Sequence, residues 1–177
     1  MNLEGLRHLS RSARILADDC SIVVLGSASL LCTFPNLGDP DQPLENTFDA
    51  DLCPEPFDET TGRMLNEALG ESNSFHLRHG YHADILRPEI FETLPNGWRE
   101  RLVPVPSCEE TFGLDPHDLA ATKILVGRDK DKALVGWLWR NKLIDSELVE
   151  ERLRTISKSE KAIIRSSKTF REVFERI

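Results

Sequence analysis

Two aspartates, Asp49 and Asp51, stand one residue apart in the short segment Thr47 to Cys53, which is bounded by turn residues. The segment predicts a strand, in which side chains two positions apart point to the same face, so both carboxylates would project together while Ala50 enters the core. Such close carboxylates repel each other unless a cation lies between them. A hard ion, Mg²⁺ or Mn²⁺, held by carboxylates and phosphate oxygens fits this requirement. The alternative is a pair of acids in a solvated loop.

The dipeptide Gly26-Ser27 follows the apolar segment Ser21 to Leu25 and precedes Ala28 to Thr33, which has the composition of a short helix. This order predicts a strand, a tight turn and a helix. Amide groups at a helix amino terminus bind phosphate, glycine permits close approach of the backbone, and the serine hydroxyl adds a hydrogen bond. The turn therefore predicts a triphosphate clamp beside the cation site. The alternative is a plain turn at Gly26 and a helix cap at Ser27.

A third aspartate, Asp84, lies in a region that predicts a β-hairpin. The segments Ser74 to Arg78 and Tyr81 to Leu86 flank His79-Gly80, a plausible two-residue turn, and Asp84 falls on the second strand. Histidines three residues apart suit a helix face rather than a hairpin, so we do not expect a closed zinc site here. The histidines with this spacing are His76, His79 and His82.

The elements that must position these residues follow from apolar spacing and capping residues. The first eighteen residues predict an amphipathic helix, and Arg101 to Val105 predicts an edge strand because of its prolines. Helices are expected to fill the chain from Asp115 onward. The residues expected to cap helices are Asp58, Asp115, Asp145 and Ser159, with Pro116 at a first helical position.

The composition is that of a soluble globular protein. Hydrophobic residues make up 40% and charged residues 29% of 177 residues, and no stretch predicts a membrane span or a signal peptide. We therefore expect a cytoplasmic protein without a membrane partner. The four cysteines form no Cys-x-x-Cys pair and predict free thiols rather than a zinc ribbon.

Charge is distributed unevenly along the chain. The net charge of -8 argues against a general nucleic-acid coat protein. Residues 1–97 carry 6 Lys and Arg against 16 Asp and Glu, whereas residues 152–177 carry 8 against 3. The acidic part and the basic tail are therefore expected to have different roles. We expect one domain, with an α/β core over residues 1–110 that a helical region, residues 111–177, completes.

These motifs resemble the DNA polymerase beta-like nucleotidyltransferase superfamily, whose mark is a hydrophobic strand, Gly-Ser or Gly-Gly, and Asp-x-Asp on the next strand. The matching stretches are Val23-Val24-Leu25-Gly26-Ser27 and Thr47-Phe48-Asp49-Ala50-Asp51-Leu52. In that superfamily a later strand supplies a third carboxylate, and Asp84 stands in that place. The resemblance covers residues 20 to 145. The interval between Ser27 and Asp49 is longer than is usual there, because of the proline-rich loop Pro35 to Asn46, which would reshape the acceptor entrance.

The chain is similar in particular to the branch that includes the AbiEii and MenT toxins. In that branch an acidic residue and a lysine share a helix, followed by an Arg-x-Lys-Asp run. The matching residues are Asp118 and Lys123, and then Arg128-Asp129-Lys130-Asp131. The resemblance implies that Lys123 neutralises a phosphate with help from the run, in which Arg128 and Asp131 are assigned to nucleotide binding. The alternative for Asp118 to Asp131 is a solvated helix face with i,i+4 ion pairs.

The resemblance implies an α+β fold with a small mixed sheet flanked by helices and a helical carboxyl-terminal part. The implied reaction transfers a nucleoside monophosphate from a nucleoside triphosphate to a hydroxyl and releases pyrophosphate. Asp49 and Asp51 would hold the metal ions, and Asp84 would help to bind a second ion and withdraw a proton from the attacking hydroxyl. Gly26 and Ser27 would bind the nucleotide.

The acceptor implied by the toxin branch is tRNA or a protein hydroxyl, and the basic tail from Arg152 supports RNA. A toxin role would imply an antitoxin partner. The competing hypothesis is a non-catalytic relative that serves as a nucleotide-sensing or protein-interaction module. That hypothesis would be favoured if Asp49 and Asp51 lay far from Gly26-Ser27, or if Asp84 faced the core.

Overall fold

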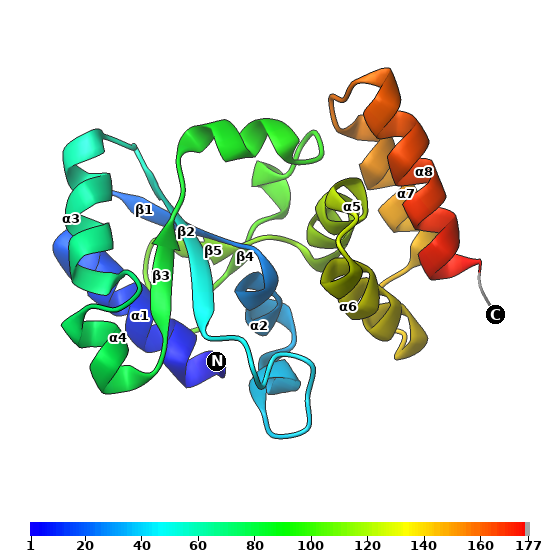
Figure 1. Ribbon diagram of the computed structural model, residues 1–177. Coiled ribbons are helices and arrows are strands. Elements are labelled where there is room, and N and C mark those ends of the chain that lie inside the picture. Colours follow the sequence, from blue (N-terminus) through cyan, green and yellow to red (C-terminus); the bar gives the residue numbers. More distant parts are fainter. Residues whose placement is uncertain (176–177) are drawn as a thin grey trace. The chain divides into compact units, whose positions relative to one another are not determined.

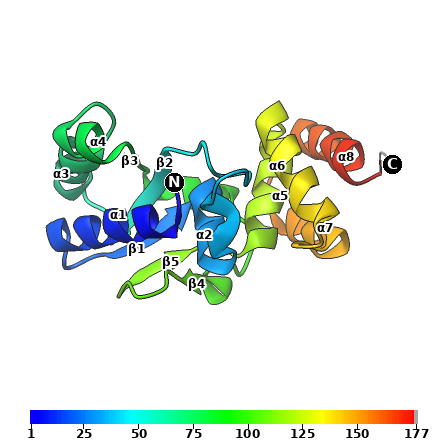
Figure 2. The same cartoon turned by 90° about the horizontal axis from the view of Figure 1, so that it is seen from below.

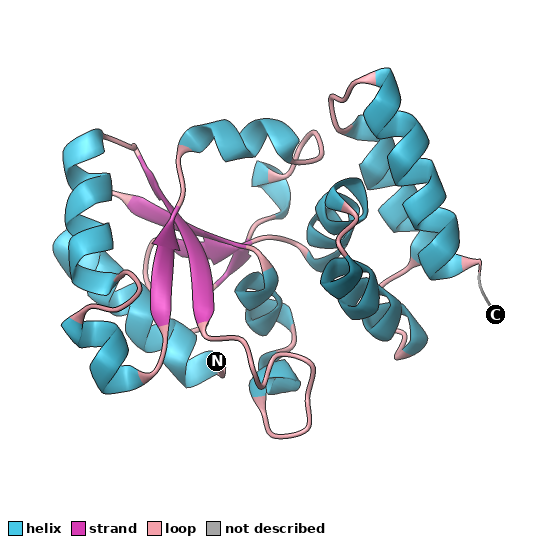
Figure 3. Ribbon diagram, viewed as in Figure 1, coloured by secondary structure: helices cyan, strands magenta, loops and turns pink. Residues whose placement is uncertain are grey.

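The computed structural model describes residues 1–175, which form two compact units. The first unit comprises Met1–Ile90 and Arg101–Asp115, and the second comprises Phe91–Glu100 and the chain from Pro116 onward. The strands lie in the first unit, whereas the second is built from helices and connecting loops (Figure 3). The predicted α+β fold class is confirmed. Among residues 1–175, no helix is long and apolar enough to cross a membrane.

The first unit is built on a five-stranded mixed sheet with the order β3-β2-β1-β5-β4. The pairs β1/β5 and β2/β3 are parallel, and the pairs β1/β2 and β4/β5 are antiparallel. Its central strand, β1, is almost wholly buried, as expected for an uninterrupted apolar run between two partners. The strands are β1 (Ser21–Leu25), β2 (Asp49–Glu55), β3 (His82–Ile85), β4 (Val103–Pro104) and β5 (Thr111–Gly113).

Helices pack against this sheet and complete the core of the first unit (Figure 1). Helix α1 contacts β1, α2 and α3, and α3 also contacts β3. Asp58 begins α3 as predicted, because its carboxylate accepts hydrogen bonds from the amides of Thr60 and Thr61 at 2.8 and 3.0 Å. The helices and 3₁₀ helices that begin in this unit are α1 (Leu3–Leu16), η1 (Ser27–Ser29), α2 (Leu30–Thr33), η2 (Pro35–Gly38), α3 (Glu59–Leu69), α4 (Ser74–His79) and η3 (Pro88–Thr93).

The second unit is a helical bundle in which α6, α7 and α8 all contact α5 (Figure 2). Helix α5 begins at Pro116, as predicted. Asp145 and Ser159 cap α7 and α8 with side-chain oxygens that accept backbone hydrogen bonds, which also confirms the prediction. The elements are η4 (Arg99–Arg101), α5 (Pro116–Val126), α6 (Asp129–Arg140), α7 (Ser146–Thr155) and α8 (Glu160–Phe174).

The predicted hairpin around His79-Gly80 is wrong. Ser74–His79 forms the helix α4, which begins where the Asn73 side chain accepts a hydrogen bond from the His76 amide at 3.0 Å. Gly80 ends this helix in the left-handed conformation (φ 77°, ψ 9°), so it is a helix cap and not a hairpin turn. The strand β3 pairs parallel to β2 and not antiparallel to Ser74–Arg78, which is helical.

Candidate functional site

The acidic residues of the site are positioned by the parallel register of β2 and β3. In this register Asp51 lies opposite Asp84, and Ala50 lies opposite Ala83. Both alanines are fully buried, so the alternating aspartates turn to the other face of the two strands. The predicted orientation of Ala50 is therefore observed, and Asp84 lies on the same side as Asp49 and Asp51.

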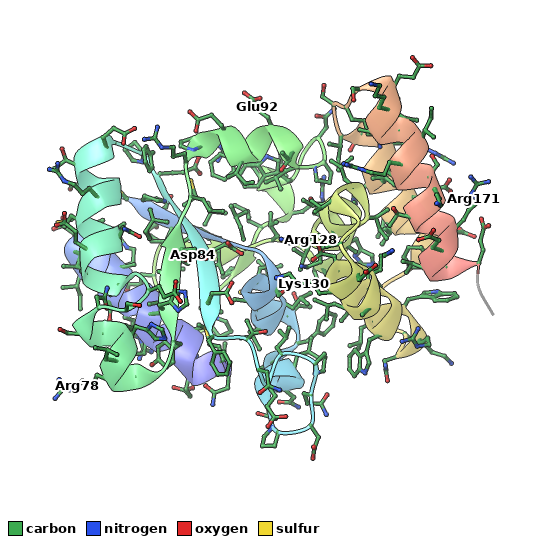
Figure 4. The ribbon with its side chains drawn as sticks, viewed as in Figure 1. Arg78, Asp84, Glu92, Arg128, Lys130 and Arg171 are labelled. Carbon is green, nitrogen blue, oxygen red and sulfur yellow. The ribbon has the colours of Figure 1, made fainter. Side chains whose placement is uncertain are left out.

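The three carboxylates converge. One oxygen from each of Asp49, Asp51 and Asp84 lies within 4.8 Å of the other two, and Asp84 projects from β3 in Figure 4. Asp49 and Asp84 are exposed, and Asp51 is half-buried. Two oxygens bonded to one Mg²⁺ at about 2.1 Å are at most about 4.2 Å apart, so small rotations of the exposed side chains would close the set around an ion. The donors are all carboxylate oxygens, which is the chemistry that Mg²⁺ and Mn²⁺ prefer.

The Gly26-Ser27 turn lies directly against this acidic cluster. Leu25, the last residue of β1, is the register partner of Asp51. A Cβ atom at Gly26 would stand 1.9 Å from Asp51 Oδ2, and Gly26 has φ 60° and ψ -163°, a conformation that almost only glycine adopts. Glycine is therefore required here by both backbone conformation and space.

The helix that follows this turn differs from the expected one in its first turn. Ser27 opens the three-residue 3₁₀ helix η1, and only then does the four-residue α2 begin. The Ser29 hydroxyl donates to the Gly26 carbonyl at 2.8 Å and holds the turn closed. So short a helix carries little macrodipole, so the groups that this turn offers to a phosphate are its backbone amides and the Ser27 hydroxyl.

The remaining predicted nucleotide-binding residues form a cluster of charges within the second unit. Lys123 Nζ on α5 donates to Asp131 Oδ1 on α6 at 2.7 Å, and Arg128 Nε donates to Asp131 Oδ2 at 2.6 Å. Lys123 and Asp131 are 8% and 1% exposed, whereas the Arg128 side chain is 59% exposed. Arg128 and the neighbouring Lys130 are labelled in Figure 4. The arrangement neutralises a buried carboxylate with two cations, one of which reaches solvent.

The alternative of a solvated helix face over Asp118 to Asp131 fits only part of this stretch, because Arg128, Asp129 and Lys130 are exposed whereas Asp118, Lys123 and Asp131 are buried. Asp118 is fully buried on α5, and its Oδ1 lies 3.5 Å from Arg152 Nε on α7. Asp118 thus pairs with a cation from another helix, and Asp131 pairs both with Lys123 of another helix and with Arg128 three residues before it. Burial alone would raise the pKa of Asp131, but the hydrogen bonds and charges of Arg128 and Lys123 hold that pKa below its usual range.

The structure thus brings together Asp49, Asp51, Asp84 and the Gly26-Ser27 turn in the first unit, and Lys123, Arg128 and Asp131 in the second. The catalytic and binding roles of these residues stay predictions. His82, which sequence reasoning treated only as an unsuitable zinc ligand, lies on β3 with Nε2 3.6 Å from Asp84 Oδ1. Its spacing of two residues from Asp84 is the signal that places both side chains on one strand face.

Comparison with known protein families shows that residues 4–175 match the family described as nucleotidyltransferase of unknown function (DUF6036). The matched region contains every residue of the acidic cluster, the Gly26-Ser27 turn and the Lys123–Asp131 pair. Searches of curated proteins and of solved structures give no match.

Replacing Gly26 with alanine should destabilise the protein and displace Asp51. The added methyl group would collide with the Asp51 carboxylate, and the backbone conformation is unfavourable for alanine. We expect a loss of about 3 kcal/mol in the free energy of unfolding, measured by denaturant titration. Gly80→Ala is the matched control, since Gly80 also has positive φ but no atom within 4 Å of its Cβ position, so it should cost only about 1 kcal/mol. Equal losses in both variants would show that the Asp51 side chain moves away from the added methyl group without a cost in stability, which would contradict the prediction.

Neutralising Asp84 should leave the metal-free protein at least as stable as the wild type. Asp84→Asn removes one of three mutually repelling charges, so the free energy of unfolding should stay constant or rise by up to about 1 kcal/mol. Thermal melts with and without Mn²⁺ test the second half of the prediction. Wild type should gain about 2.7 kcal/mol at a hundredfold excess over the dissociation constant, and Asp84→Asn should gain much less. The exposed Asp19→Asn is the control and should behave as wild type.

Asp131→Asn should destabilise the protein by about 2–4 kcal/mol at pH 7, because two cations lose their buried partner. The folded-state pKa of Asp131 lies below the ordinary value of 3.8, so its contribution is complete above that pH and is lost as the pH falls through the folded value. The difference in unfolding free energy between wild type and variant should therefore stay constant from pH 7 to pH 5 and shrink below about pH 4. Asp129→Asn, at an exposed position on the same helix, should show little change. A difference that persists at low pH would contradict the ion-pair account.

Proposed function

The chain belongs to this nucleotidyltransferase family, and on that premise we propose that it transfers a nucleoside monophosphate from a nucleoside triphosphate to a hydroxyl acceptor, with release of pyrophosphate. The observation that carries this proposal is the convergence of Asp49, Asp51 and Asp84 within 4.8 Å beside the Gly26 turn. Three carboxylates on one face of a sheet can bind divalent cations, and such cations bind the oxygens of a polyphosphate.

The proposed roles follow from position and exposure. Asp49 and Asp51 would hold Mg²⁺ or Mn²⁺, which when bound supplies positive charge to the phosphate oxygens. Asp84, exposed beside them, would accept the proton of the attacking hydroxyl as its oxygen bonds to the α-phosphorus. The bond from that phosphorus to the bridging oxygen breaks, and pyrophosphate leaves. The amides of Gly26 and Ser27 would bind phosphate oxygens of the nucleotide.

The charged cluster of the second unit is proposed to assist nucleotide binding mainly through Arg128. Its side chain is more than half exposed, whereas Lys123 and Asp131 are buried and hold each other. A guanidinium fixed by a buried carboxylate is well suited to a phosphate group, because less of its rotamer freedom is lost on binding. Lys123 and Asp131 would then act by fixing Arg128, with Lys123 also adding positive charge.

RNA is the acceptor that the charge distribution favours. The exposed residues of α8 include Lys161, Arg165 and Lys168, spaced to lie along one side of the helix. A cavity of about 410 Å³ between α7 and α8 is lined by apolar side chains, by three basic residues and by two acidic ones, namely Arg154, Lys158, Arg171, Glu150 and Glu175. Arg171 projects from α8 in Figure 4. Basic and apolar groups in one groove suit a strand of nucleotides. A protein hydroxyl, which the toxin resemblance implies alongside tRNA, is the second candidate acceptor.

The non-catalytic alternative loses both of the conditions that would have favoured it. Asp51 lies against the Gly26 turn, and Asp84 lies on the same face as Asp49 and Asp51. A toxin role with an antitoxin partner is part of the proposal and follows from the resemblance to the AbiEii and MenT branch, and a cytoplasmic location is proposed from the sequence, which predicts no membrane span or signal peptide. Growth arrest on expression of the wild type, but not of Asp51→Asn, would support the toxin role, and equal growth of both would contradict it.

Incubation with each α-labelled nucleoside triphosphate, Mg²⁺ or Mn²⁺, and either total tRNA or cell-extract protein tests the proposal. We expect the label to move to RNA with stoichiometric release of pyrophosphate, and added salt should weaken the reaction because phosphate contacts release counterions.

Asp51→Asn should lower the rate of transfer at least 10²–10³-fold, whereas Asp19→Asn should leave that rate unchanged. Arg128→Gln should raise the triphosphate concentration for half-maximal rate about tenfold. Triphosphate binding without any transfer or pyrophosphate release would establish the non-catalytic alternative instead.

A further inference from the structure

His82 is a fourth polar residue on the face of the sheet that carries the aspartates. It lies two residues before Asp84 on β3, and it is the register partner of Asp49 on β2. His82 is only 9% exposed, whereas the Asp84 side chain is 53% exposed. A nearly buried imidazole thus borders the open carboxylate cluster.

The two nitrogens of the His82 ring have different surroundings. Nε2 lies 3.6 Å from Asp84 Oδ1, just beyond hydrogen-bond distance. Nδ1 is buried and has no hydrogen-bond partner among the described residues. Nε2 is therefore the nitrogen of this ring that faces the aspartate cluster.

A second histidine fixes the plane of the His82 ring. The ring of His76, on α4, lies 4.6 Å from that of His82 between centroids, with an interplanar angle of 43°. His76 is itself anchored, because the Ser72 amide donates to His76 Nδ1 at 2.9 Å. That hydrogen bond restricts the orientation of the His76 ring, which packs at a tilted angle against the ring of His82. The start of α4 therefore holds His82 against Asp84.

We propose that His82 is a positioning residue for Asp84: a small rotation of the exposed Asp84 carboxylate brings Oδ1 within hydrogen-bond distance of the His82 Nε2–H and leaves the other carboxylate oxygen to the cation. The terminal torsion of an aspartate is soft, so an exposed carboxylate samples many orientations. A single fixed donor selects one of them, as partners of metal-binding side chains commonly do. This inference rests on the proposed function, because it assumes that the three aspartates hold a cation.

Geometry favours positioning over direct ligation by His82. Among residues 1–175, the group of side chains whose ligand atoms lie within 4.8 Å of one another contains the three aspartates and does not include His82. Oxygen ligands also suit Mg²⁺ and Mn²⁺ better than imidazole does. The ring therefore acts on the carboxylate and not on the ion.

The affinity for Mn²⁺ alone, measured by calorimetry and by electron paramagnetic resonance, tests this role. His82→Leu removes the donor at similar volume and should weaken Mn²⁺ binding about 10–100-fold. His82→Gln restores an N–H donor and should recover most of the affinity. His79→Ala is the matched control, because His79 belongs to a separate ring cluster with His8, Phe75 and Tyr81 and should bind Mn²⁺ as wild type does.

Two results would overturn the inference: equal Mn²⁺ affinity in wild type and His82→Leu, or nitrogen coupling in the wild-type Mn²⁺ spectrum that disappears in His82→Leu, which would make His82 a ligand. If His82→Leu does not fold, His76→Ala serves instead and should weaken Mn²⁺ binding several-fold, and unchanged affinity there overturns the inference equally. Mn²⁺ binding that depends on His82, in a protein that transfers no nucleotide, would contradict only the proposed function. A wild type that binds no Mn²⁺ would overturn both.

Discussion

The candidate site depends above all on the parallel register between β2 and β3. Backbone hydrogen bonds hold Asp84 opposite Asp51 although their carboxylates repel each other. A slip of β3 by one residue would bring Ala83 among the carboxylates and turn Asp84 toward the core, where an unpaired charge is costly. Ala50 and Ala83 are both fully buried, so packing on the core side of the sheet stabilises this register. The same register places the three carboxylates close together on the opposite side of the sheet. The sheet therefore stores an electrostatic strain that a bound cation would relieve.

The Gly26 turn adds a second constraint to the same place. The absence of a side chain at Gly26 lets Asp51 Oδ2 occupy the space that a Cβ would take. Because Gly26 has no Cβ atom, the amides of the turn, which could bind phosphate, lie against the carboxylates, which could bind a cation. Both features break ordinary local rules, since like charges cluster and the backbone adopts a conformation that suits only glycine. Such violations are expected where a protein binds a ligand.

Much of the fold follows from local signals in the sequence. Apolar runs, capping aspartates and a proline at a first helical position predict β1, α3 and the helices from Pro116 onward, because each signal acts within a few residues. The α4 error shows the limit of such signals. The dipeptide His79-Gly80 is compatible with a hairpin turn and with a helix cap. The choice depends on whether β3 pairs with the segment just before it or with β2. Asn73, a good amino-terminal cap, is the local clue to the helix.

The parts of the candidate site that depend on the alternation of side chains along a strand could be predicted from the sequence. The parts that depend on contacts between elements far apart in the sequence could not. Strand alternation suffices to place Asp49 and Asp51 together, but the burial of Asp118 and Asp131 depends on partners from other helices, Arg152 and Lys123. Spacing along one helix can predict i,i+4 pairs but cannot predict these. For His82, the spacing of two residues from Asp84 predicts that both side chains lie on the same face of β3. The contact with the ring of His76, which comes from α4, could not be predicted in this way. A histidine spacing that suggests a zinc site in isolation therefore leads, once the strands are paired, to control of an aspartate's orientation.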